Sequence, residues 1–109
     1  MTVHEMAKML ELTPLSVTDG ERAFSGVYIG DLLSWVMGRA KSDNVWITIM
    51  SNINIVAVAS LADVACIILA EGVTVDETVR TTAEAKGINL YSSEKTAYEL
   101  ASMLARIDV

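Results

Sequence analysis

The stretch INIVAVASLADVACIILA, residues 53–70, decides the fold because its eighteen residues carry a single charge, at Asp63. A transmembrane helix needs about 20 predominantly apolar residues, so a membrane span has to be considered. Asp63 interrupts the run near its middle without positive flanks, and both features disfavour insertion. Helix formers dominate before Asp63, whereas residues 65–69 form a short block typical of a strand. We therefore predict a buried helix over residues 54–63 and a buried strand over residues 65–69.

The alternation of strand and helix continues through the second half of the chain. Residues 45–50 follow a polar turn and combine β-branched with aromatic side chains, which predicts a strand. An amphipathic helix over residues 76–86 ends at Gly87, and residues 88–91 predict another strand. A last helix then runs to about residue 106.

This alternation is typical of a parallel sheet that is covered by helices on both faces. We therefore predict a three-layer α/β/α fold with a mostly parallel sheet. Residues 45–50 and 65–69 are expected to be its central, parallel neighbours, because their nearly continuous apolar runs suit strands that are buried on both sides. A chain of 109 residues is long enough for one core, so we expect a single domain over residues 1–109.

The beginning of the chain predicts a short helix and two short strands. Thr2 and Glu5 form a capping-box pattern, which starts a helix that runs to about residue 9. Residues 10–13 are expected to form a strand that ends at Pro14, and residues 22–27 a second one. The side chains expected to point inward from the helix are Met6, Met9 and Leu10.

A further helix is predicted from Asp31, as its N-cap, to about residue 40. Trp35 lies well off its apolar face. Since 52% of the residues are hydrophobic, more apolar side chains exist than one small core readily hides. We therefore expect a homodimer with Trp35 as its anchor and Tyr28 beside it; the alternative is that Trp35 packs under the N-terminal helix. The predicted apolar face consists of Leu32, Leu33, Val36, Met37 and Ala40.

Composition and charge disfavour several classes of partner. Fourteen acidic against eight basic residues give a net charge of -6, whereas nucleic acids and anionic membranes require a basic surface. Cys66 is the only cysteine, so no disulfide framework or thiolate metal site is expected. The first residues lack the pattern of a signal peptide. We therefore expect a cytoplasmic protein with no bound cofactor and no nucleic-acid or membrane partner.

The sequence contains no specific catalytic set. His4 is the only histidine, and Cys66 falls in a predicted buried strand, where a thiol is normally inert. Neither a Walker loop nor a GxGxxG motif is present. We therefore predict that the chain is not an enzyme and that it has no catalytic and no metal-binding residues.

Polar residues at predicted strand ends are the candidates for ligand binding. Ser51, Asn52 and Asn54 follow one strand and precede a helix, at the position where open parallel sheets bind ligands. The helix start there offers N–H donors suited to an anion, although these residues can equally serve as helix caps. For Asp63, a helix-end or turn role is the stronger expectation. The candidate ligand-binding residues are Ser51, Asn52, Asn54, Asp63, Gly72 and Ser92.

Three segments together resemble the DRTGG domain family: FSGVYIGDLLSWVM, VWITIMSNINIVAVASLADVACIILAEG and AKGINLYSS. The resemblance extends from about residue 10 to 105. Asp63 is matched to the Asp of the family's name, with Val64 in place of the Arg and Ala70-Glu71-Gly72 in place of Thr-Gly-Gly. The resemblance implies a fold similar to that of the N-terminal domain of HPr kinase/phosphorylase. It also implies a regulatory or dimerisation role like that of domains that accompany nucleotide-sensing CBS pairs in some pyrophosphatases.

Three functions remain open on these grounds. The first is a non-enzymatic regulatory and dimerisation domain that senses a small anionic ligand such as an adenine nucleotide. The second is a pure protein-interaction subunit of a redox complex of the hydrogenase type. The third is a kinase-related enzyme fragment, which the missing phosphate loop disfavours because phosphoryl transfer needs a nucleotide cradle.

Overall fold

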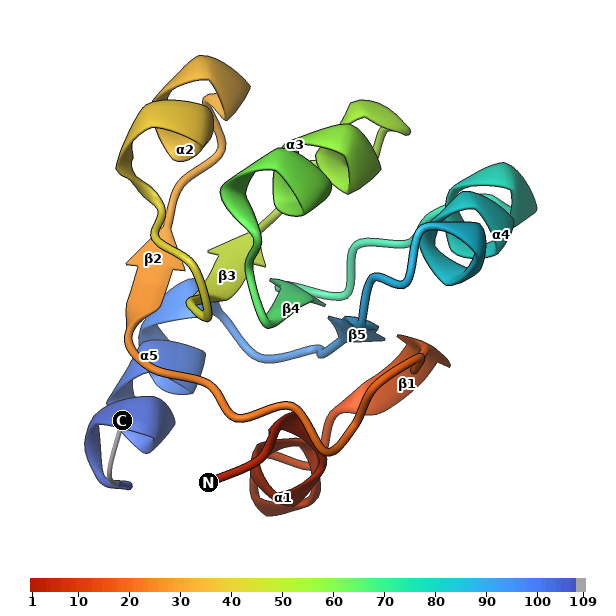
Figure 1. Cartoon of the computed structure of the whole chain (residues 1–109). Coiled ribbons are helices and arrows are strands. Elements are labelled where there is room, and N and C mark those ends of the chain that lie inside the picture. Colours follow the sequence, from red (N-terminus) through yellow and green to blue (C-terminus); the bar gives the residue numbers. More distant parts are fainter. Residues whose placement is uncertain (108–109) are drawn as a thin grey trace.

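The computed structural model describes residues 1–107, and these form one layered α/β unit (Figure 1). Helices and strands alternate along most of the chain, which confirms the predicted three-layer α/β/α fold. In chain order the elements are α1 Val3–Met9, β1 Thr13–Ser16, β2 Val27–Ile29, α2 Leu33–Arg39, β3 Val45–Thr48, α3 Asn54–Ala62, β4 Cys66–Leu69, α4 Glu77–Ala85, β5 Leu90–Ser92 and α5 Ala97–Ala105.

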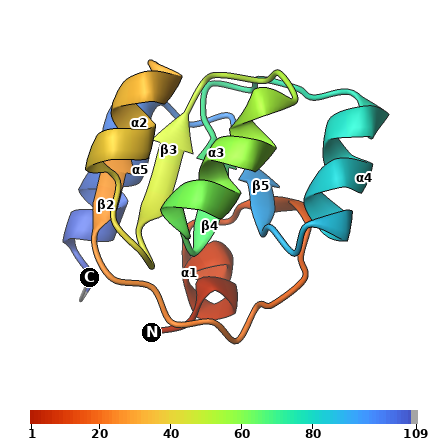
Figure 2. The same ribbon diagram turned by 45° about the horizontal axis from the view of Figure 1, so that its top comes forward.

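The five strands form one sheet in the order β1-β5-β4-β3-β2. The strands β2 to β5 are parallel to their neighbours, and β1 pairs antiparallel with β5 at one edge. The parallel strands follow one another in space as they do in sequence, so α2, α3 and α4 cover one face. Helices α1 and α5 cover the other face (Figures 1 and 2). The predicted central, parallel neighbours are therefore confirmed as β3 and β4.

Every residue of β3 and β4 is buried, as strands between two helical layers require. Alternate side chains serve the two layers: Val45, Ile47 and Ile68 pack with α1 and α5, whereas Trp46 and Ile67 pack with α2, α3 and α4. Full burial of one such side chain contributes about 1.5–3 kcal/mol, so these two strands anchor the fold. The run over residues 53–70 is core, and no helix within residues 1–107 has both the length and the apolarity of a membrane span.

The first strands differ from the prediction. The chain turns at Glu11, whose φ is 55°, and β1 begins only at Thr13 and includes Pro14. Proline is tolerated there because β1 is an edge strand and needs no donor on its open side. The predicted strand over residues 22–27 is also wrong, since β2 begins at Val27. Met6 and Leu10 point inward as expected, but Met9 is 50% exposed.

The second helix also differs in detail. Asp31 does not cap it; its carboxylate instead accepts hydrogen bonds from the Thr48 hydroxyl (2.8 Å) and the Ile49 N–H (2.9 Å). The predicted five-residue apolar face is too wide, because Leu32 and Met37 are 58% and 51% exposed. A helix of two turns at the rim of the sheet has room to bury only the row centred on Val36. Leu33 and Ala40 pack partly against the core.

Candidate functional site

Five of the six candidate ligand residues lie at the carboxyl edge of the parallel sheet. Ser51, Asn52 and Asn54 follow β3, Gly72 follows β4, and Ser92 ends β5. The Asn52 side-chain oxygen accepts a hydrogen bond from the Asn54 N–H at 2.9 Å, just before α3, whose N-cap residue is Ile53. Both asparagine side chains are nevertheless exposed, which leaves their amides accessible.

A crevice of the kind that binds ligands is expected between β4 and β5. Their outgoing connections run to α4 on one face and to α5 on the other, so the two loops diverge (Figure 1). Backbone hydrogen bonds bridge the loops: the Gly72 N–H donates to Ser93 O, and the Glu71 N–H donates to Lys95 O, each at 2.8 Å. Gly72 needs its glycine for its φ of 71°.

Charge divides this edge into two parts. Glu94 places a carboxylate oxygen 3.2 Å from the position of a Cβ on Gly72, and Glu71 is adjacent in the chain. Two carboxylates repel an anion, so the part beside Gly72 and Ser92 is unfavourable for a phosphate. The neutral amides of Asn52 and Asn54 are therefore the better place for an anionic group.

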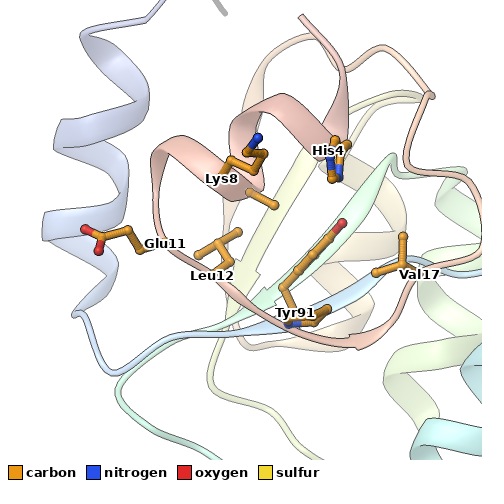
Figure 3. A pocket seen from close by; sticks show the side chains of 8 residues that line it. His4, Lys8, Glu11, Leu12, Val17 and Tyr91 are labelled. Atoms are coloured by element: carbon orange, nitrogen blue, oxygen red, sulfur yellow. The ribbon is translucent and has the colours of Figure 1, made fainter.

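A cavity of about 400 Å³ lies between α1 and the β1–β5 edge of the sheet (Figure 3). The sequence did not indicate it, because its walls come from segments that are far apart in the chain. Tyr91, on β5, crosses it with its hydroxyl directed toward α1, on the side of His4. His4 is exposed. We call this cavity the α1 pocket; its lining residues are His4, Ala7, Lys8, Glu11, Leu12, Pro14, Val17 and Tyr91.

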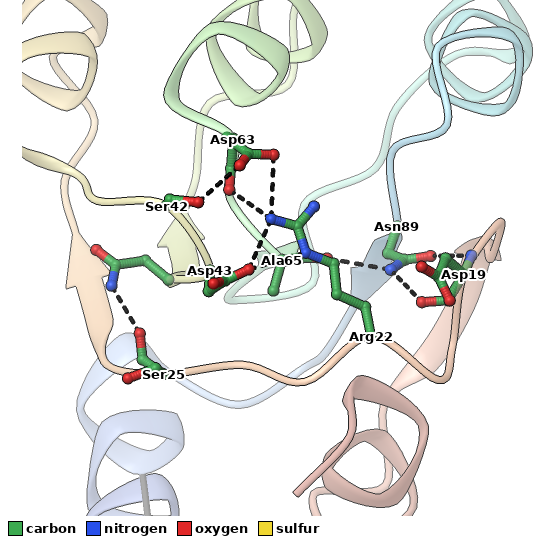
Figure 4. A network of polar contacts seen from close by, with 9 residues as sticks. Asp19, Arg22, Ser25, Ser42, Asp43, Asp63, Ala65 and Asn89 are labelled. Atoms are coloured by element: carbon green, nitrogen blue, oxygen red, sulfur yellow. Dashed lines mark hydrogen bonds and ion pairs between the residues drawn. The ribbon is translucent and has the colours of Figure 1, made fainter.

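Asp63 is separated from the other candidates by the length of β4 and lies at the amino edge of the sheet (Figure 4). It ends α3 in the left-handed conformation, with φ 58°. Its carboxylate accepts from the Ser42 hydroxyl (2.6 Å) and from the Arg22 guanidinium (3.1 Å). The Ser42 hydrogen bond and the Arg22 charge lower the pKa of Asp63. This is the helix-end role that the sequence favoured.

The amino edge is further tied together by two polar side chains. Arg22 also donates to the Asp43 carboxylate (2.9 Å) and to the Asp63 carbonyl (2.7 Å). Asn89, which is 2% exposed, accepts from the N–H groups of Thr18 and Asp19 (both 3.0 Å). The Asn89 amide also donates to the carbonyls of Asp19 (2.8 Å) and Ala65 (3.1 Å). Both side chains have their partners within the fold, so this edge is structural.

The structure also places the two predicted dimer-interface residues, Trp35 and Tyr28, and the cysteine. Trp35 is 52% exposed, and the Arg39 guanidinium lies 3.8 Å from the centre of its ring. Tyr28 is partly buried and packs against the core and Gly30. Cys66 is fully buried, and this burial raises the pKa of its thiol to about 12. Within residues 1–107, no group of three or more His, Cys, Asp or Glu is placed to hold a metal ion.

Comparison with known structures confirms the fold. The chain is similar to a crystal structure of the CBS and DRTGG domains of the regulatory region of Clostridium perfringens pyrophosphatase, complexed with the activator diadenosine tetraphosphate. The TM-score is 0.74 at 11% sequence identity, and the match covers 96% of this chain and 46% of that chain. This chain thus spans less than half the length of its structural relative.

Sequence comparison gives the family. A search of curated proteins found no match. The family model of the DRTGG domain, in contrast, matches residues 27–107, which include β2 to β5 and four of the helices. The resemblance inferred from the sequence is therefore confirmed, and the chain belongs to the DRTGG domain family.

Proposed function

We propose that this chain is a regulatory module that acts as a homodimer and catalyses no reaction of its own. The observation that carries the proposal is the combination of an open sheet edge with exposed apolar side chains beside it. The strand β2 is the last of the sheet and pairs on one side only, with β3. An open edge of this kind is a template for pairing with another chain.

The side chains around this edge suit a second copy of the same chain. Ile29 is 49% exposed and Leu32 is 58% exposed, and Trp35 follows on α2. Stacking of Arg39 on the indole restrains Trp35, so the ring is a pre-organised anchor for an interface. If two copies pair through β2 about a two-fold axis, each contributes the same surface, and the two α2 helices come together. We call this surface the β2–α2 face; it consists of Ile29, Leu32 and Trp35.

Sedimentation velocity at micromolar concentration tests the homodimer. We expect a dimer for the native chain and a monomer for Ile29→Lys, because a charge on an open edge prevents strand pairing. Trp35→Ala should weaken the dimer, whereas Tyr98→Ala is the matched control, since Tyr98 is 80% exposed on the opposite layer. A monomeric native chain at about 100 μM would contradict the proposal; a dimer unchanged by both test variants would place the interface elsewhere.

The regulatory role also implies a ligand, and the carboxyl edge offers the amides of Asn52 and Asn54 for an anionic group. The structural relative is a regulatory region in complex with a nucleotide activator, which makes adenine nucleotides the first class to test. A ligand present at about 100 times its dissociation constant should stabilise the fold by about 2.7 kcal/mol. A thermal-shift series with AMP, ATP and diadenosine tetraphosphate therefore tests this part of the proposal.

The double variant Asn52→Ala/Asn54→Ala gives that experiment its control. We expect it to remove the thermal shift while it leaves the melting temperature without ligand nearly unchanged. A shift that persists in the double variant would place the nucleotide elsewhere. No shift with an intact dimer would favour a pure interaction subunit, and nucleotide turnover abolished by a point substitution would contradict the non-enzymatic role.

A further inference from the structure

Tyr91 carries a polar group that the fold leaves unused. The residue is only 2% exposed, and its hydroxyl faces the α1 pocket (Figure 3). Burial raises the pKa of Tyr91, and nearby Cys66 raises it further, so the phenol remains a neutral donor. No hydrogen bond to this hydroxyl forms within residues 1–107. Since no fully buried side-chain polar atom within residues 1–107 lacks a partner, the unpaired hydroxyl is open to the cavity and can donate to an acceptor that enters it.

The walls of the pocket define what can enter. Apart from Tyr91, the interior is formed by the apolar side chains of Ala7, Leu12, Pro14 and Val17, which suit a hydrophobic body. A cavity of about 400 Å³ lies within the range of about 300–1,000 Å³ that is typical of small-molecule sites.

The polar groups of the rim are distributed unevenly. His4 lies on the α1 wall toward which the Tyr91 hydroxyl points and supplies an imidazole, and Lys8 lies farther along the same helix and supplies an ammonium group. Glu11 lies beyond Lys8, away from the hydroxyl. One end of the pocket thus attracts an anionic acceptor, while Glu11 repels a second negative charge and disfavours a polyphosphate.

We propose that the α1 pocket binds a small apolar monocarboxylate. The hydrocarbon body lies against Leu12, Pro14 and Val17, and the carboxylate accepts a hydrogen bond from the Tyr91 hydroxyl on the His4 side of the pocket, with the Lys8 ammonium farther along α1. A charge-assisted hydrogen bond in a mostly apolar cavity is the strongest polar contact available there. Seven of the eight lining residues precede residue 27, where the DRTGG match begins, so most of the site lies outside the matched residues.

The pocket is held open by contacts that do not depend on a ligand. The N–H groups of Val3 and His4 donate to the carbonyls of Arg22 and Gly20, both at 2.9 Å, which fixes α1 over the sheet. The Leu12 N–H donates to Ala7 O at 2.9 Å and secures the turn after the helix. A pre-formed site loses less entropy on binding, so a ligand of about ten heavy atoms can bind at sub-millimolar concentration.

The probe for this site is 3-phenylpropionate, titrated into the full chain and followed by ¹H–¹⁵N NMR. We expect saturable shifts in α1, in β1 and around Tyr91, with residues 51–54 unaffected. Tyr91→Phe removes only the hydroxyl oxygen and should weaken binding about tenfold or more. Tyr98→Phe is the matched control and should bind as the native chain does. The neutral alcohol 3-phenyl-1-propanol should bind at least tenfold more weakly than the acid.

The outcomes separate this site from the proposed function. No saturable shift in α1 and β5 would overturn the inference, and so would equal binding of the acid and the alcohol. Equal affinity of the Tyr91→Phe variant, with its fold confirmed by an unchanged spectrum elsewhere, would overturn the role of the hydroxyl. Nucleotide binding at residues 51–54 and self-association through the β2–α2 face are read from other residues, so either can fail independently.

Discussion

The two edges of the parallel sheet are held in different ways. At the amino edge, side-chain hydrogen bonds join segments that are far apart in the chain: Asn89 reaches Thr18 and Asp19, and Arg22 reaches Asp43 and Asp63. At the carboxyl edge, contacts such as that of Asn52 with the Asn54 N–H are mostly local or made by the backbone. The longer exceptions are the bonds from Thr48 and Ile49 to Asp31 and from Lys95 to the Leu10 carbonyl.

This difference distinguishes polar groups that stabilise the fold from polar groups that are available for binding. Polar groups at the amino edge are already satisfied within the fold, so they cannot bind a ligand without a loss of stability. The exposed amides of Asn52 and Asn54 at the carboxyl edge make only the local contact from the Asn54 N–H to Asn52, so they can interact with other molecules at little loss of stability. Variants at the two edges should therefore differ strongly in their effect on stability.

The largest effect is expected for Asn89→Ala. The change removes five hydrogen bonds and leaves the buried Ala65 carbonyl and the N–H groups of Thr18 and Asp19 without their partner. We expect the free energy of unfolding to fall by about 3 kcal/mol, because each unsatisfied buried group costs about 1–3 kcal/mol and part of the loop can move to reach water. Urea unfolding measures this loss. A change below about 1 kcal/mol would show that the amino edge is not held by Asn89.

Arg22→Ala should have a smaller effect. Arg22 joins the segments that carry Asp43 and Asp63, but its side chain is 26% exposed, so solvent screens both ion pairs. We expect a loss of about 1–2 kcal/mol in the free energy of unfolding, mostly from the charge-assisted hydrogen bond to the Asp63 carbonyl. The Arg22→Lys variant should lose only part of this free energy of unfolding. If added salt abolished the whole effect, the ion pairs rather than this hydrogen bond would carry it.

Acid should weaken the same edge. The native pKa of Asp63 is lower than its ordinary value of 3.8, so its contribution to stability is complete above that value and is lost as pH falls through the native pKa. Stability should therefore decrease below about pH 4. The Asp63→Asn variant should show a shallower decrease, which pH-dependent urea unfolding can measure. Equal slopes for the two proteins would assign the acid sensitivity to other carboxylates, such as Glu5 and Glu99, whose pKa values are also lowered by their helix caps.

The smallest effect is expected at the carboxyl edge. Asn52→Ala removes one local hydrogen bond to the Asn54 N–H at an exposed helix start, and Asn54→Ala removes an exposed amide. We expect each to change the free energy of unfolding by about 0.5 kcal/mol or less. The same urea titration provides the comparison with Asn89→Ala. A loss above about 2 kcal/mol at either asparagine would mean that the two edges do not differ as proposed.

Much of the architecture was predictable from local sequence. The apolar run over residues 53–70 with its single Asp predicts a helix followed by a strand, because strands between two helical layers need apolar side chains on both sides. The Thr2 capping box and the C-terminal Gly87 of α4, with its φ of 72°, occur as predicted. The cluster of Ser51, Asn52 and Asn54 at a strand end follows from the same alternation. These features depend on neighbours within a few residues, so the sequence alone determines them.

Other features were decided only by the tertiary structure. Asp31 is a residue type that commonly caps helices. Its carboxylate instead accepts hydrogen bonds from the Thr48 hydroxyl and the Ile49 N–H at the end of the neighbouring strand. Asp63 lies opposite the other candidates because one whole strand separates it from Gly72. The α1 pocket forms because β1 pairs with β5 and brings the first residues of the chain beside Tyr91. Each of these arrangements is stabilised by contacts between segments that are distant in sequence, and local patterns carry no signal for such contacts.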